Sequence, residues 1–251
     1  MRNSRLTQKL ILALILVLVG EVVWLFSRSF ARNQACCAPP LATNAIFSAM
    51  ESIGVLQFYS QVGQDRWILQ RVFPGVTDGY FVDVGSASGI ADSNTKVLEA
   101  LGWRGVCIDP FPRDMEGRHC QMFEKVVGRE SGQTVQFRKA GFLGGIQDNL
   151  GRWKDDAAVQ QAELVEFQTT SLTDILNRAN APTYIHYLSL DIEGAELEAL
   201  RGFDFSRYQV GAMTIEHNFE EEKRAQIRSL LESKGYRLVH TIAQDDCYVL
   251  K

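Results

Sequence analysis

The sequence predicts an α/β domain built on a mostly parallel β-sheet with helices on both faces. Three observations support this prediction. Short apolar runs alternate along the chain with segments whose apolar residues recur at helical spacing. Several of these runs end at an acidic residue or a glycine, which is typical of a buried strand that leads into a loop. The last two runs are separated by a short polar loop, which indicates an antiparallel hairpin at the C-terminus.

The chain begins with a segment that differs from the rest. Residues 1–9 form a basic tail, and residues 10–26 form an apolar run whose only charge is Glu21. A helix of this length spans about 25 Å, and extension to residue 30 approaches the ~30 Å of a bilayer core. We therefore expect a transmembrane signal anchor at residues 10–30, with a cleaved signal peptide as the alternative. Residues 31–56, which include Pro39 and Pro40, are expected to form a linker.

Composition restricts the class of the remaining domain, residues 57–251. The whole chain has 251 residues, of which 46% are hydrophobic and 22% charged, so one globular domain is expected. The part from residue 57 onward holds 21 basic and 28 acidic residues. Nucleic-acid binding needs clustered Lys and Arg, so no nucleic-acid partner is expected. The five cysteines lack metal-type spacing and predict neither a zinc site nor a disulfide framework, with Cys107 expected in the core.

The elements follow in order along this domain. The predicted helices have apolar residues at helical spacing, and Thr170 and Ser171 provide a cap for one of them; they cover residues 66–73, 94–101, 172–179, 195–200 and 219–234. The predicted strands are apolar runs at residues 80–84, 105–108, 126–127, 135–137, 184–190, 209–215, 236–240 and 247–250. Glu196 and Glu198 are expected on the solvent face of their helix. Residues 140–153 are rich in glycine and predict either a substrate-covering lid with a hinge at Gly144 and Gly145 or a plain surface loop.

Acidic residues close four of the predicted strands. They are Asp83 (with Gly85), Asp109, Asp191 and Glu216. Ligands of parallel α/β sheets bind at the carboxyl ends of the strands, so these side chains are expected at one site. A helix cap is the simpler explanation for any single one of them.

The loop DVGSASG at residues 83–89 suggests a nucleotide-like cofactor. Its glycines permit a close approach of the backbone, and Asp109 lies twenty residues after Gly89, where an acid can accept hydrogen bonds from a ribose. An NAD site usually has the spacing G-x-G-x-x-G, whereas here the glycines are four apart and Ala87 takes the middle place. An acid beside the loop suits a ligand with an ammonium group, as in S-adenosylmethionine, which disfavours the alternative of an NAD-dependent enzyme.

Four motifs then carry a specific resemblance. SQVGQDRWI at 60–68, FVDVGSASG at 81–89, SLDIEGAELEALRG at 189–202 and IEHN at 215–218 occur in this order. In these the chain resembles the FkbM family of S-adenosylmethionine-dependent methyltransferases, over about residues 59–251. The resemblance implies a Rossmann-like class I methyltransferase fold and methylation of a hydroxyl group on a sugar, glycolipid or small natural product. The family usually has Ala and Asn or His in the glycine loop where this chain has Ser86-Ala87-Ser88.

The resemblance also implies roles for individual residues. It assigns the methionine end of the cofactor to Asp83, Gly85, Ser86 and Gly89 and its ribose to Asp109. Gln64 and Asp65 are expected either to close over the same end of the sheet or to cap a helix. The fold alone does not ensure catalysis, so a non-catalytic, membrane-anchored binding or trafficking protein is an alternative.

The chemistry needs a group that activates the acceptor. A sugar hydroxyl is a poor nucleophile, so a base or a metal ion must lower its effective pKa. The available groups are Asp191, Glu193, Glu216 and His217. Of these, His217 titrates near neutrality and is the expected base. Alternatively, Asp191, Glu216 and Asn218 offer oxygen ligands for Mg²⁺.

Localisation depends on the anchor. The positive-inside rule slightly favours a cytoplasmic N-terminus and a domain on the far side of the membrane, which is anchored through residues 10–26. For a eukaryotic protein, the domain is expected in the Golgi lumen, to which the cofactor is imported. For a bacterial protein, the cytoplasmic face of the membrane is expected, because S-adenosylmethionine is made in the cytosol and a domain outside the inner membrane would lack it.

Overall fold

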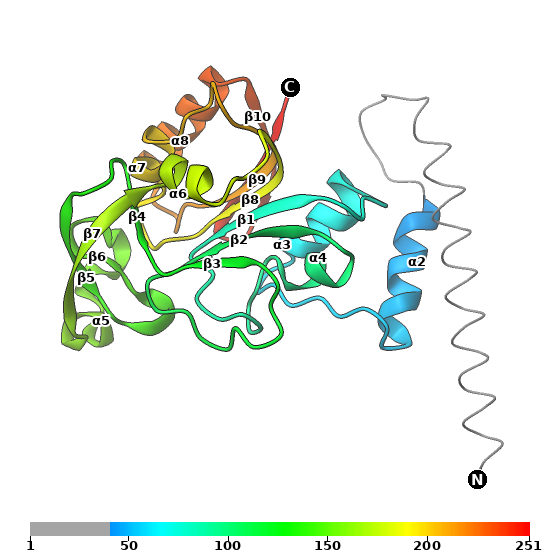
Figure 1. Cartoon of the computed structure of the whole chain (residues 1–251), viewed down its shortest axis with the longest axis horizontal. Coiled ribbons are helices and arrows are strands. Elements are labelled where there is room, and N and C mark those ends of the chain that lie inside the picture. The colour runs from blue at the N-terminus through cyan, green and yellow to red at the C-terminus, as the bar shows by residue number, and fades with distance from the viewer. Residues whose placement is uncertain (1–40) are drawn as a thin grey trace, which may run out of the picture.

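The computed structural model describes residues 41–251 (Figure 1). The predicted anchor at residues 10–30 lies outside the described residues, as does the start of the predicted linker. Within residues 41–251, no helix has both the length and the apolar character needed to cross a membrane.

A seven-stranded sheet forms the centre of the domain. Its spatial order is β10-β11-β9-β8-β1-β2-β3. The strands are β1 (Tyr80–Val84), β2 (Arg104–Ile108), β3 (Gln121–Phe123), β8 (Tyr184–Leu190), β9 (Gln209–Glu216), β10 (Tyr236–Ile242) and β11 (Asp245–Leu250). Neighbours from β3 to β9 pair in parallel, whereas β11 is antiparallel to both β9 and β10. The predicted parallel sheet with a C-terminal hairpin is confirmed, and β11 inserts between β9 and the edge strand β10.

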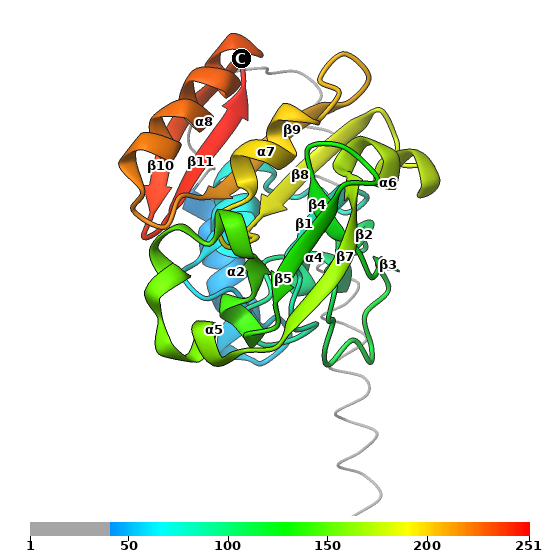
Figure 2. The ribbon, with the colours of Figure 1, turned by 90° about the vertical axis from the view of Figure 1, so that its left-hand side faces the viewer.

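Helices cover both faces of this sheet (Figure 1). One face carries α3 (Gln64–Trp67), which continues as a π-helical turn (Ile68–Val72), and α4 (Lys96–Ala100). The other face carries α6 (Leu172–Arg178), α7 (Glu196–Arg201) and α8 (Glu221–Ser233). Figure 2 shows α8 lying along the hairpin of β10 and β11.

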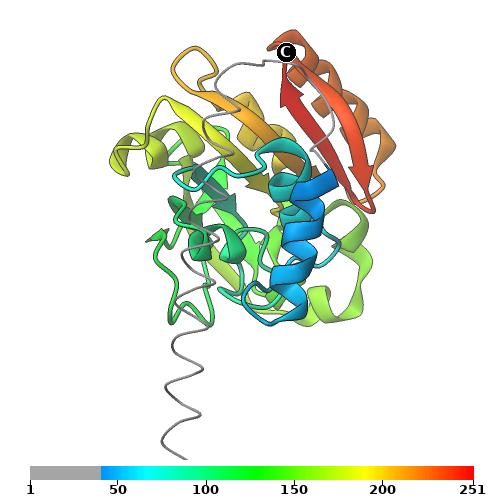
Figure 3. The ribbon, with the colours of Figure 1, turned by 90° about the vertical axis from the view of Figure 1, so that its right-hand side faces the viewer.

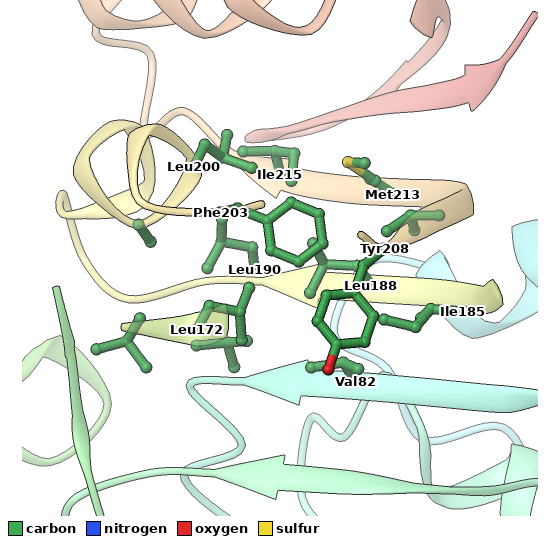
Figure 4. Packing of buried hydrophobic residues seen from close by; sticks show 14 of the residues in the cluster. Val82, Leu172, Ile185, Leu188, Leu190, Leu200, Phe203, Tyr208, Met213 and Ile215 are labelled. Carbon is green, nitrogen blue, oxygen red and sulfur yellow. The ribbon is translucent and has the colours of Figure 1, made fainter. Parts of the chain in front are cut away.

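The two faces have separate apolar cores because side chains alternate along each strand. Val82, Leu188 and Ile215 point toward α6 and α7, where they meet Leu172 and Leu200 (Figure 4). Phe81 and Tyr187, which precede Val82 and Leu188, point the other way. They join Trp67 and Leu98 in the second core, on the α3 and α4 side, which also contains Cys247 of β11.

Helix α2 (Leu41–Ser52) occupies part of the predicted linker. It packs against the π-helical turn that follows α3 and lies in front of the sheet in the view of Figure 3. Phe47 is buried, and its ring contacts that of Phe58 with centroids 6.4 Å apart. Glu51 forms a salt bridge with Arg66. Residues 41–52 of the predicted linker are therefore helical, with an apolar side chain that is buried and an acid that pairs with the start of the domain.

A second sheet of four strands has the order β4-β7-β5-β6. It contains β4 (Val126–Gly128), β5 (Thr134–Arg138), β6 (Gly145–Ile146) and β7 (Leu164–Ser171), with α5 (Ala157–Gln161) before β7. The rings of Phe111, Phe137 and Phe167 pack together beneath it, with centroids 5.5–5.9 Å apart. The predicted strands at 126–127 and 135–137 are confirmed as β4 and β5, whereas β7 was not predicted.

Cys107 and Cys120 form a disulfide bond. The prediction of no disulfide framework is therefore wrong for this pair. Cys107 lies in β2 and Cys120 lies just before β3. These two strands pair in parallel, so the two cysteines are close in space although they are 13 residues apart in sequence. Cys107 is fully buried, as expected, and Cys247 is a buried free thiol.

Candidate active site

A cavity of about 430 Å³ opens at the carboxyl ends of the central strands. This volume falls within the roughly 300–1,000 Å³ of small-molecule sites. The lining residues come from both sheets. They include predicted cofactor residues, the carboxylates at the ends of β8 and β9, and the segment between β5 and α5.

The strand register explains why acids gather here. Val84, Leu190 and Ile215 are aligned across β1, β8 and β9. The residues that follow them are Gly85, Asp191 and Glu216, so these three lie in one row at the rim. Asp109 follows the aligned Ile108 of β2, and Asp245 of β11 pairs directly with Glu216. The row therefore holds four carboxylates, and Gly85 is the only one of its five members without a side chain.

The loop after β1 lies against the loop after β8. Gly85 has a φ of +85°, and a Cβ at this position would lie 1.6 Å from the backbone oxygen of Asp191. No other residue fits this approach. Asp83 is buried and accepts a hydrogen bond from the Thr95 hydroxyl (2.6 Å). Burial raises the pKa of Asp83, and the nearby Arg118 opposes this shift.

Two polar atoms of this region are buried without a protein partner. They are the Ser86 hydroxyl and the side-chain oxygen of Asn94, and both residues line the cavity. Buried polar groups are normally hydrogen-bonded, so these atoms suit a polar ligand or ordered water. Gly89 does not line the cavity; its backbone N–H donates to the Arg113 oxygen (2.8 Å) and thus fixes the far end of the loop.

Asp109 lines the cavity at the end of β2. Its carboxylate accepts the backbone N–H of Ala87 (3.0 Å) and of Phe111 (2.7 Å). Burial raises the pKa of Asp109, and these two donors oppose the shift. Since each carboxylate oxygen has two lone pairs, Asp109 keeps acceptor capacity that faces the cavity.

Gln64 and Asp65 have different surroundings. Gln64 lines the cavity and donates from Nε2 to the Asp245 carboxylate. Asp65 is fully buried and does not line the cavity. Its carboxylate accepts the backbone N–H of Tyr59 (2.7 Å) and Ser60 (3.1 Å). The structure thus brings Gln64 to the site, whereas Asp65 organises the turn before α3.

Asp191 and Glu216 lie together with a third carboxylate, Glu193. One oxygen from each lies within 4.8 Å of the others. Glu193 has a φ of +54°, an uncommon conformation that turns its side chain back toward the cavity. Glu193 belongs to the DIEGAE motif and was one of the groups expected to be available to activate the acceptor, although His217 was the expected base.

Crowding of these acids disfavours their charged forms. Burial, Glu193 and Asp245 raise the pKa of Asp191 well above its ordinary value. Burial and the negative charge of Asp191 likewise raise the pKa of Glu216. Burial raises the pKa of Glu193 to about 7, against a hydrogen bond from Asn218. The cluster therefore retains protons near neutral pH or requires a cation.

Asn218 contacts the cluster through its amide nitrogen. Nδ2 donates to Glu193 (3.0 Å) and to Glu216 (2.6 Å). An amide nitrogen does not ligate Mg²⁺, which takes oxygen ligands. In this arrangement Glu193, rather than Asn218, supplies the third oxygen of a candidate cation site.

The structure does not bring His217 to the cavity. Its ring is buried on the α8 side of the sheet, where Nε2 lies 3.8 Å from Asp246, whose carboxylate is bound by Arg224. Nδ1 accepts the backbone N–H of Phe219 (3.0 Å). The cause is alternation: Glu216 points into the cavity, so the next side chain points away.

Glu196 also differs from its expected place. It is 1% exposed, and its Oε1 accepts the backbone N–H of Ile192 (3.0 Å) and of Gly194 (2.9 Å). The solvent-facing prediction is wrong for Glu196, because its carboxylate supports the turn that carries Glu193. Glu198 is partly exposed and pairs with Arg201 (2.5 Å), as expected for the outer face.

The glycine-rich segment at 140–153 borders the cavity through residues that include Phe142 and Trp153. Gly145 lies in β6 and pairs with Arg138 of β5. The segment also packs closely against the turn after β8, since a Cβ on Gly194 would lie 1.9 Å from the backbone oxygen of Asn149. The segment borders the cavity, and its predicted role as a lid with a hinge at Gly144 and Gly145 stays a prediction.

A profile of the Methyltransferase FkbM domain matches residues 83–238. The chain belongs to this family. Among curated proteins and solved structures, none is significantly similar to it. Membership in the FkbM family identifies the domain as methyltransferase-like. The match begins at Asp83 in β1 and ends at Leu238 in β10, so it contains the loop after β1, Asp109 and the whole Asp191–Glu193–Glu216 cluster.

Proposed function

We propose that the protein is an S-adenosylmethionine-dependent methyltransferase that methylates a hydroxyl group of a glycan, glycolipid or small natural product. One observation carries this proposal. A single cavity is lined both by the loop after β1 with Asp109 and by the carboxylate cluster at the ends of β8 and β9. A cofactor half and an acceptor half therefore face each other, as methyl transfer between two bound molecules requires.

The residues of the cofactor half suit S-adenosylmethionine. Asp83 offers a carboxylate for the ammonium group, and Asp109 offers acceptors for the ribose hydroxyls. The unpartnered oxygens of Ser86 and Asn94 offer further polar contacts. Ile108, Val126 and Val127 give the cavity an apolar surface that suits the adenine ring.

When bound, S-adenosylmethionine supplies an electrophilic methyl group on a positively charged sulfur. The acceptor oxygen gains this methyl, the carbon–sulfur bond breaks, and the hydroxyl proton must leave. Glu193 is placed to take that proton, since it lines the cavity and its pKa of about 7 allows it to be deprotonated at neutral pH. Asp191 and Glu216 orient the acceptor from the same rim.

A second version of the acceptor half uses Mg²⁺. Three carboxylate oxygens within 4.8 Å of one another suit a small divalent cation, whose charge would relieve their mutual repulsion. Asp191, Glu193 and Glu216 would be its ligands. The cation would then lower the pKa of the acceptor hydroxyl in place of a base.

We also propose that residues 10–26 anchor the protein in a membrane with the domain on the non-cytosolic side. The Cys107–Cys120 disulfide supports this side, because such bonds persist in oxidising compartments. In a Golgi lumen, the cofactor has to be imported.

Calorimetric titration of the full chain with S-adenosylmethionine, with and without Mg²⁺, tests the proposal. Micromolar binding is expected, and tighter binding or turnover with Mg²⁺ would select the second version. A folded protein that binds neither S-adenosylmethionine nor NAD would point to the non-catalytic, membrane-anchored alternative. Binding of NAD alone would contradict the proposal.

A further inference from the structure

Arg118, in the segment between β2 and β3, is a buried cation that the proposed chemistry does not use. Its side chain is 1% exposed. Nε donates to Glu99 (2.7 Å), and Nη1 donates to the backbone oxygen of Gly89 (3.1 Å) and to Ser93 (3.2 Å). Nη2 donates to the Thr95 hydroxyl (2.8 Å). All three guanidinium nitrogens are therefore engaged, and most of their partners belong to the loop after β1 or to the start of α4.

The contact with Thr95 leads directly to Asp83. The Thr95 hydroxyl lies 2.6 Å from the Asp83 carboxylate and 2.8 Å from Nη2 of Arg118. A hydroxyl has one proton to donate. Because it accepts from Arg118, its own proton points to Asp83. Arg118 thus fixes the direction of the hydrogen bond that orients Asp83.

The charges point to the same connection. Asp83 is 4% exposed, and burial raises its pKa. Among the charged groups that act on it, Arg118 lowers the pKa, whereas Asp109 and Glu99 raise it. Without Arg118, Asp83 would gain a proton more readily and lose its attraction for an ammonium group.

Two further contacts hold Arg118 in place. Glu99 accepts the backbone N–H of His119 (3.1 Å) and of Cys120 (2.7 Å), so the segment is tied to α4. The disulfide ties Cys120 to Cys107 in β2. Both constraints act within two residues of Arg118.

We propose that Arg118 is a positioning residue for cofactor recognition: through Thr95 it orients Asp83 and keeps it ionised to receive the ammonium group of the cofactor. This inference rests on the proposed function, since it concerns the same cofactor site. It assigns a role to a segment, residues 118–120, that does not line the cavity.

The test compares two probes on the full chain. S-adenosylhomocysteine carries the ammonium group, and 5′-methylthioadenosine lacks it while keeping the ribose and adenine. Arg118→Met is expected to weaken binding of S-adenosylhomocysteine at least tenfold at pH 7 and to leave 5′-methylthioadenosine within twofold. The loss should grow as the pH falls from 8 to 6, whereas Arg118→Lys should restore part of the affinity.

General damage to the site would weaken both probes equally, and an unchanged affinity ratio in Arg118→Met would overturn the inference. If Arg118→Met does not fold, Thr95→Val removes the connecting hydroxyl and should give the same selective loss. An unchanged ratio there would equally contradict it. If the wild-type chain binds neither probe, the proposed function itself fails.

Discussion

Asp191 and Glu216 occupy the same row of neighbouring parallel strands, and their carboxylates lie within 4.8 Å of each other. Like charges in such positions destabilise a sheet unless a proton or a cation separates them. Glu193 adds a third carboxylate from the next turn. An arrangement this unfavourable for stability is typical of a site that serves function.

Glu193→Gln should abolish most of the turnover. The amide cannot accept the hydroxyl proton, and general bases contribute about 10²–10⁴-fold, so kcat should fall at least 100-fold. The Kd for S-adenosylmethionine should stay within threefold, because Glu193 lies in the acceptor half. Glu198→Gln is the matched control on the outer face of α7. Full activity of Glu193→Gln would remove Glu193 from the mechanism.

Stability should depend on pH through the same residue. The folded-state pKa of Glu193, about 7, lies above its ordinary value of 4.5. Between these values the folded protein holds a proton that the unfolded chain has released. The free energy of unfolding should therefore fall as the pH rises toward 7, by about 1.4 kcal/mol per pH unit for each such group. Asp245, with a pKa of about 6, acts in the same direction.

Thermal melting from pH 5 to 8, without cofactor and with a chelator, measures this dependence. The melting temperature should drop toward pH 8, and Glu193→Gln should reduce the slope. Glu198→Gln should retain it. The same slope in Glu193→Gln as in the wild type would show that another group binds the proton.

The central strands could be predicted because a strand buried on both faces is a continuous apolar run. Residues 80–84 and 184–190 were predicted with the bounds that β1 and β8 have. The acids at their ends identified the rim of the sheet, since the ends of parallel strands meet there. Asp191 and Glu216 could therefore be expected to meet before their distance was known.

Other features depend on neighbours that one sequence does not disclose. Strand β7 has no continuous apolar run, because polar residues such as Glu166 and Gln168 alternate with apolar ones. Its place in the sheet depends on its pairing with β4 and β5. The disulfide could be predicted only if β2 and β3 were known to be adjacent strands. The side of the sheet to which the His217 ring points depends on where β9 ends. The strand continues to Glu216, one residue beyond its predicted end.

His217→Gln tests that direction. Because the ring faces Asp246 and not the cavity, we expect kcat and the Kd for S-adenosylmethionine to stay within threefold. Burial lowers the pKa of His217, so loss of the ring removes little charge at pH 7. Initial rates measured beside Glu193→Gln separate the two candidate bases. Loss of turnover in His217→Gln alone would restore the histidine as the base.

Asp109→Asn should weaken both S-adenosylmethionine and 5′-methylthioadenosine, because both carry the ribose. The amide offers fewer acceptor sites to the ribose and to the N–H groups of Ala87 and Phe111. Loss of charge-assisted hydrogen bonds costs roughly 1.5–3 kcal/mol, which corresponds to a tenfold or greater rise in Kd. Asp155→Asn, at an exposed residue that does not line the cavity, is the control. Unchanged affinity for both ligands would exclude Asp109 from the ribose site.

The Cys107–Cys120 disulfide should stabilise the domain and its cofactor half together. A cross-link over a loop of this size contributes about 3 kcal/mol by restricting the unfolded chain. The double variant Cys107→Ser/Cys120→Ser should therefore melt at a lower temperature. It should also bind S-adenosylhomocysteine less tightly, since Arg118 lies two residues from the bond. A reductant should lower the melting temperature and the affinity for S-adenosylhomocysteine in the wild type, and it should change neither in the double variant. If the reductant lowers the melting temperature of the wild type but not its affinity, the disulfide supports the fold without positioning Arg118.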